Sequence, residues 1–157
     1  MVRVTEVRSE SGLYLDHRGE LMRYATTLVG PSDAADVVSD AMESLLRSRQ
    51  LLSAMNPAAL MHRAVLRKAQ SMHRSAFRRR RREQRFGREL TLSNPELRPD
   101  VVTAIIGLSP KQRACVYLTY WNDLAPSQVS EWLAISEGSV KRHLARARAR
   151  LREVVDE

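Results

Sequence analysis

The strongest constraint on the fold lies near the C-terminus, where residues 136 to 151 read SEGSVKRHLARARARL. Apolar residues recur there every three or four positions and basic residues fill the rest, which predicts a helix with one packed face and one strongly positive face. Ser136 is a good N-cap, because its hydroxyl can accept from free N–H groups of the first turn. The alternative is a surface helix whose arginines are simply solvated.

A shorter helix is expected just before this one, over residues 127 to 133, with a tight turn at 134 to 136. Two helices at this spacing are typical of a helix-turn-helix, in which the second helix enters the major groove of DNA. Further helices are expected over 13 to 29, from a cap at Ser32 or Asp33 to Leu46, from Asn56-Pro57 to Arg82, from Val101, and from Ser109-Pro110 to Trp121. The sequence therefore predicts an all-α protein.

Composition divides the chain into two small helical domains. Residues 1 to 11 are polar and read as a flexible leader, and residues 12 to 82 form the first domain. Residues 83 to 100 are polar and interrupted by glycine and proline, as in a flexible linker. Residues 101 to 157 form the second domain. A chain of 157 residues has room for two such units with separate cores.

The net charge of +8 indicates a polyanionic partner, because clustered cations gain by releasing counterions from phosphates. The chain has no apolar run of about eighteen residues and no secretory signal, so we expect a cytoplasmic protein without membrane insertion. The lone Cys115 reads as a buried thiol, and the four histidines show no ligand spacing. We expect no metal, no cofactor and, without paired carboxylates or a triad, no enzyme.

The C-terminal motifs resemble a known family. Residues 108 to 113 (LSPKQR), 118 to 124, 129 to 133, 138 to 142 (GSVKR) and 146 to 148 (RAR) resemble the promoter-binding C-terminal domain of bacterial sigma-70 factors, most closely the extracytoplasmic-function type. The resemblance implies recognition of the minus-35 promoter element by Ser139, Lys141, Arg142, Ala145 and Arg146, with Ser139 near a phosphate. The chain carries Gln128 and Ser130 where relatives commonly have an acid and an alanine.

An acidic stretch, residues 33 to 42 (DAADVVSDAM), resembles the polymerase-docking helix of the same family. The resemblance implies that Asp36, Val37 and Asp40 face the clamp helices of the largest subunit of core RNA polymerase. Judged from its residues alone, this stretch is equally an acidic, solvated helix surface.

The long helix after Asn56 corresponds in the resembling family to the part that handles the opened minus-10 element. Such a task needs rings or amides for bases and cations for phosphates. Leu60 and Arg67 stand where relatives usually have tryptophan and asparagine. The candidates for bases and phosphates are Asn56, His62, Arg63, Arg67, Arg74, Arg78 and Arg79, within a basic run that continues to Arg82.

Two functions compete at this stage. The first is a sigma factor that binds core RNA polymerase and promoter DNA, with an anti-sigma factor as a possible partner. The second is a helix-turn-helix regulator that binds duplex DNA as a dimer without polymerase. The acidic docking helix and the arginine-rich central helix favour the first, because a simple regulator needs neither.

Overall fold

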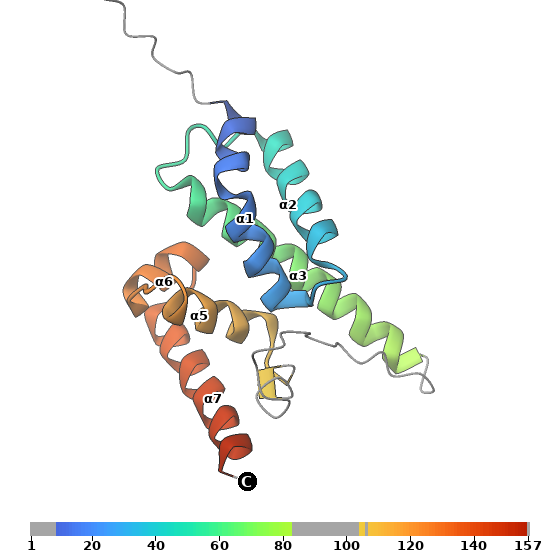
Figure 1. Cartoon of the computed structure of the whole chain (residues 1–157), viewed down its shortest axis with the longest axis vertical. Helices are drawn as coiled ribbons and strands as arrows, with labels where there is room; N and C mark the ends of the chain where they lie inside the picture. Colours follow the sequence, from blue (N-terminus) through green and yellow to red (C-terminus); the bar gives the residue numbers. More distant parts are fainter. Residues whose placement is uncertain (1–8, 83–103, 106, 157) are drawn as a thin grey trace, which may run out of the picture.

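The regular structure is helical throughout the part of the chain that the computed structural model describes, residues 9–82, 104–105 and 107–156. This confirms the predicted all-α fold class. The longer helices are α1 (Glu10–Val29), α2 (Ala34–Ser48), α3 (Pro57–Arg82), α5 (Pro110–Tyr120), α6 (Pro126–Leu133) and α7 (Glu137–Val155) (Figure 1).

Local capping sets most helix ends. The Ser9 hydroxyl accepts from the Gly12 N–H at 3.0 Å, so α1 begins at Glu10, within the predicted leader. Gly30 ends α1 with φ at 87°, a left-handed conformation that favours glycine. The side-chain oxygen of Asn56 accepts from the Ala59 N–H at 3.0 Å, as the predicted cap of α3. Residues 1–8 of the leader and the predicted linker, 83–100, lie outside the described residues.

Helices α1, α2 and α3 pack on one another and form what we call the first unit. The cleanest apolar stripe is that of α2, which places Val37, Val38 and Ala41 in the core. Helix α3 extends beyond the other two helices of this unit (Figure 1). The second unit comprises α5, α6 and α7, with α5 packed on both of the others.

The two units share one core. The sequence suggests separate cores, but the buried apolar residues of α1, α2, α3, α5, α6 and α7 form a single cluster. Helix α5 lies against α1 and α3, and α6 lies against α3 (Figure 1). Leu118 and Tyr24, both fully buried, belong to this cluster from opposite units. Packing between their helices therefore sets the relative orientation of the units.

None of the helices in the described ranges is both long enough and apolar enough to cross a membrane. Cys115 is fully buried, as predicted, and burial raises the pKa of its thiol to about 11. Among the described residues no three His, Cys, Asp or Glu side chains gather where they could hold a metal ion.

Candidate nucleic-acid interface

A three-residue turn joins α6 to α7. Ala134 ends α6 in the left-handed conformation, with φ at 53°, and Ser136 caps α7 by accepting from the Ser139 N–H at 3.1 Å. The Ser130 hydroxyl donates to the Ile135 carbonyl at 2.6 Å, which ties the end of α6 to the turn. Ser130, which stands where the resembling family commonly has alanine, therefore stabilises the turn through its hydroxyl.

Gln128, the other departure, also has a local role. Its side-chain oxygen accepts from the Ala125 N–H at 2.8 Å, so it caps the start of α6 as an acid at that position could. The amide performs this task without adding a negative charge.

The face of α7 that points away from the core carries the predicted minus-35 residues. Val140, Leu144 and Ala147 are buried against the rest of the second unit. On the opposite face, the structure exposes every one of Lys141, Arg142, Ala145 and Arg146. This division follows directly from the three- and four-residue spacing of the apolar positions.

Three contacts order the start of this basic face. The Ser139 hydroxyl accepts from Arg142 Nη2 at 3.1 Å and from the Ser136 hydroxyl at 2.9 Å. Lys141 Nζ lies 3.3 Å from Glu137 Oε1, an exposed pair four residues apart. Burial lowers the pKa of His143, and the neighbouring Lys111, Arg146 and Arg142 lower it further.

The predicted docking residues divide between two faces of α2. Asp36 and Asp40 are exposed one turn apart on the same side, where a partner could reach both. Val37 is 2% exposed and packs in the core, so its side chain holds α2 in place and offers no surface for contact. Farther along the exposed side, Glu43 pairs with Arg47.

Helix α3 presents some of its predicted DNA-binding residues to solvent and covers others. Arg67, Arg74, Arg78 and Arg79 are exposed. Asn56 is exposed as well, although its side-chain oxygen is engaged in the cap of α3. Arg67, Arg74 and Arg78 are seven and four positions apart, so they lie along one side of α3 and form a basic surface there.

The structure does not present His62 to DNA. Its imidazole is 0% exposed and lies between the rings of Tyr24 and Trp132, with centroids at 4.7 and 5.0 Å. Its Nδ1 contacts the Ala58 carbonyl at 2.7 Å, and its Nε2 lies 3.4 Å from Glu20 Oε1, an ion pair when the ring is protonated. His62 is therefore a buried contact between the units and not a base-binding residue in this arrangement.

Arg63 is also engaged within the chain. Its Nε donates to the Trp132 carbonyl at 3.2 Å and its Nη2 to the Glu131 carbonyl at 3.0 Å. These are carbonyls of the last turn of α6, where the helix dipole favours a cation. The expectation of a free phosphate-binding arginine does not describe Arg63 in this structure.

Glu20 joins the two units and has no signal in the sequence. Its Oε1 accepts from Asn122 Nδ2 at 2.6 Å, across 102 positions of the chain. The contact with His62 is the largest cause that lowers the pKa of Glu20 to about 2, with a smaller contribution from Asn122 and an opposing one from partial burial.

Glu20→Gln is expected to lower the free energy of unfolding at pH 7 by about 1 to 2 kcal/mol, a figure reduced for the solvent exposure of the carboxylate. Because the folded pKa lies below the ordinary 4.5, this stabilisation is full above pH 4.5 and is lost as the pH falls toward about 2. Urea unfolding of wild type and Glu20→Gln at pH 7 and pH 3 measures it. Asp16→Asn, an exposed neutralisation on the same helix, should show no such pH dependence.

The sequence comparisons with known proteins match the second unit. The family described as Sigma-70, region 4, matches residues 99–151. RNA polymerase sigma-E factors of Streptomyces avermitilis and Streptomyces antibioticus are each 43% identical over 49 residues, and that of Streptomyces coelicolor is 46% identical over 46. These matches cover 29 to 31% of this chain and 26 to 27% of the relatives, so the chain matches about a quarter of their length.

The fold likeness extends over both units. The sigma factor RpoE of Bartonella quintana, in its co-crystal structure with the anti-sigma factor NepR, matches with a TM-score of 0.74 at 20% identity. The match covers 93% of this chain and 96% of that one. The second unit therefore matches region 4 of sigma-70 factors and is similar to the corresponding part of sigma-E factors, and the two units together share the fold of a sigma factor.

Proposed function

We propose that this chain is a sigma factor that binds core RNA polymerase and directs promoter-specific transcription initiation. The observation that carries this function is the exposed basic face of α7, which lies inside the region 4 match at residues 99–151 and follows a short helix and a tight turn. Such a face fits the major groove, where guanidinium and ammonium groups reach base edges and phosphates.

Each exposed surface has a role in this proposal. Asp36 and Asp40 dock on the clamp helices of the largest polymerase subunit, and the first turns of α7 read the minus-35 element. The exposed cations of α3 hold phosphates of the opened minus-10 region, because most of them lie along one side of the helix. The α7 residues are Ser139, Lys141, Arg142, Ala145 and Arg146, and the α3 residues are Arg67, Arg74, Arg78 and Arg79. Ser139 orders Arg142 here through its hydroxyl.

An anti-sigma factor is a second proposed partner. The structural relative of Bartonella quintana is a complex of a sigma factor with an anti-sigma factor. The shared fold makes the same kind of regulation a reasonable proposal for this chain. Its surfaces available for such a partner include the exposed sides of α2 and α7.

The test is transcription with purified bacterial core RNA polymerase on a library of genomic fragments, with and without this protein. We expect start sites that depend on the protein and share two sequence elements upstream. Tight binding to a palindromic duplex in the absence of polymerase, with no change in start sites, would instead identify a dimeric helix-turn-helix regulator.

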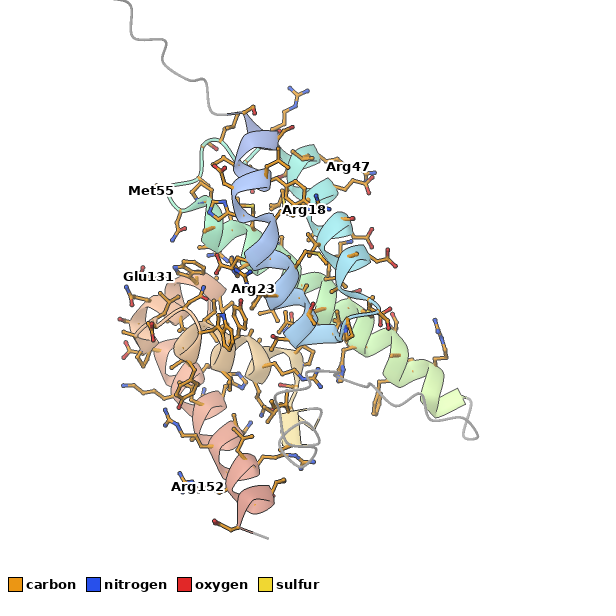
Figure 2. The ribbon with its side chains drawn as sticks, in the orientation of Figure 1. Arg18, Arg23, Arg47, Met55, Glu131 and Arg152 are labelled. Carbon is orange, nitrogen blue, oxygen red and sulfur yellow. The ribbon has the colours of Figure 1, made fainter. Side chains whose placement is uncertain are left out.

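Arg146→Ala is expected to weaken binding to the minus-35 element by about 1 to 3 kcal/mol and to relax the preference at one base pair, if Arg146 binds a base edge. Promoter selection by the reconstituted holoenzyme on a randomised minus-35 library measures both effects. The matched control is Arg152→Ala, an exposed arginine near the far end of α7 (Figure 2). Equal weakening on all sequences would make Arg146 a phosphate contact.

A further inference from the structure

One side of α3 carries four side chains whose chemistry suits unpaired nucleic acid. They are Arg67, Gln70, Arg74 and Phe77, and we call them the α3 row. Successive members lie three or four positions apart, so their side chains follow one another along the same side of the helix. Gln70 is half-buried and the other three are exposed. The row thus combines cations for phosphates, an amide for a base edge and a ring for a base face.

The ring of Phe77 is not needed by the core of the first unit. Phe77 is 62% exposed, and the last buried residue among the described side chains of α3 is Ala69, two turns earlier. The C-terminal end of α3 extends beyond α1 and α2 (Figure 1). A single exposed apolar residue is common on protein surfaces. The position of this ring, three residues after Arg74 and directly before Arg78, is what gives it a candidate ligand.

The rings of α3 are unequally accessible. They belong to His62, His73 and Phe77. His62 is 0% exposed, and Leu60 stands where the resembling family usually has tryptophan. His73 and Phe77 are exposed and lie one turn apart, in the second half of the helix. A ring of α3 that meets an unpaired base in this structure therefore comes from the second half and not from the start.

The α3 row is accessible while the two units are packed together. Arg63 lies four positions before Arg67 and would continue the row toward the start of α3, but it is engaged by the carbonyls at the end of α6. From Arg67 onward the row needs no rearrangement of the units. Phe77 lies 17 positions after Leu60, which corresponds to about 25 Å along the helix. The base that Phe77 reaches therefore differs from one that a side chain at position 60 would reach.

We propose that Phe77 stacks on an unpaired base of the opened promoter strand, while Arg67 and Arg74 hold the adjacent phosphates. The inference rests on the proposed sigma function and adds a ring to the surface that binds opened DNA. Every base has a face on which a phenyl ring stacks, so Phe77 contributes affinity for opened DNA and little sequence preference. Fully paired DNA offers no free base face to this ring.

The first experiment compares two DNA probes bound by the reconstituted holoenzyme at low temperature. One is a closed promoter duplex, and the other is the same duplex with a mismatched bubble over the minus-10 element. We expect Phe77→Ala to weaken binding to the bubble by about tenfold and to leave binding to the closed duplex unchanged. Equal weakening on both probes, or none on the bubble, overturns the stacking role.

Two further variants at the same position separate stacking from a general apolar contact. Phe77→Leu keeps an apolar side chain but removes the ring, so it should lose as much affinity for the bubble as Phe77→Ala. Phe77→Trp supplies another ring and should bind at least as tightly as wild type. The matched control is Leu15→Ala, which removes a 65% exposed apolar side chain from α1 and should change neither probe. Full affinity in Phe77→Leu would identify an apolar contact without stacking and overturn the proposal.

The second experiment locates the stacked base. Abasic sites, placed one at a time in the bubble, remove a base and keep its phosphate. At the stacked position an abasic site should weaken wild-type binding by about tenfold and should not weaken Phe77→Ala any further, whereas the two losses add elsewhere. Losses that add at every position of both strands overturn the stacking.

Salt dependence separates the ring from its neighbouring cations. Arg74→Ala should reduce the slope of log affinity against log salt by about 0.7, as expected for one lost phosphate contact on a single strand. Phe77→Ala should leave the slope unchanged, and a reduced slope would show that the ring acts only by positioning a cation. Wild-type protein that directs transcription although Phe77→Ala binds the bubble normally overturns the stacking alone. Wild-type protein that directs no start sites overturns the proposed function, and the stacking with it.

Discussion

Asp36→Arg/Asp40→Arg is expected to weaken binding to core RNA polymerase by more than about a hundredfold, which corresponds to about 2.7 kcal/mol. Both carboxylates are exposed on one side of α2, so in the proposed complex they face a basic partner surface. Reversal replaces two attractions with two repulsions, which cost several kcal/mol when they are brought together at an interface. Fluorescence anisotropy of the labelled chain, titrated with core polymerase, measures the change.

The fold should tolerate this double reversal, because exposed substitutions usually change the free energy of unfolding by less than about 0.5 kcal/mol. Glu153→Arg/Asp156→Arg is the matched control, since it makes the same change in net charge at exposed positions near the end of α7. Loss of binding in both variants would indicate a general effect of charge. Retained binding in the α2 variant would show that α2 is not the docking surface.

Tyr24→Ala should have the largest effect on stability, about 3 to 5 kcal/mol. Tyr24 is 0% exposed and lies between His62 of its own unit and Tyr117 of the other, so truncation leaves a cavity where the units meet. We expect both units to lose stability in one urea transition. Circular dichroism and tryptophan fluorescence, which report on different parts of the chain, should give coincident curves.

Tyr24→Phe separates the contribution of the ring to stability from that of its hydroxyl. The Tyr24 oxygen is buried and has no hydrogen-bond partner among the described residues, and burial raises the pKa of the phenol far above its usual range. Removal of an unsatisfied polar atom is expected to leave stability equal to or above that of wild type. A cost as large as that of Tyr24→Ala would contradict this assignment.

The helices themselves were predictable from sequence because their signals are local. Ser136 and Asn56 mark helix starts through contacts within three residues, and the structure places both as expected. The exposed face of α7 follows from the same local rule, since the spacing of Val140 and Leu144 fixes which side is packed. Exposure of Asp36 and Asp40 follows likewise from the stripe of α2.

The junction between the units was not predictable, because its contacts join residues far apart in the chain. Arg63 lies 68 and 69 positions from its acceptors, and Arg113 of α5, whose Nη1 donates to the Leu28 carbonyl of α1 at 2.9 Å, lies 85 from its own. A histidine or arginine on a helix carries no local mark that distinguishes a DNA contact from a contact with another helix. His62 and Arg63 therefore read as DNA-binding residues in the sequence and are inter-unit contacts in the structure.

The contacts of Arg63 and Arg113 with backbone carbonyls also determine which positions can be substituted without loss of the contact. Both guanidinium groups bind main-chain carbonyls, and every amino acid supplies a carbonyl, so the side chains at Leu28 and Glu131 are not what the arginines recognise. Exchange of Glu131 for another helix-compatible residue should leave the contact intact. The constraint falls on Arg63 and Arg113 alone, and such a contact leaves no paired pattern of substitutions for a comparison of homologous sequences to detect.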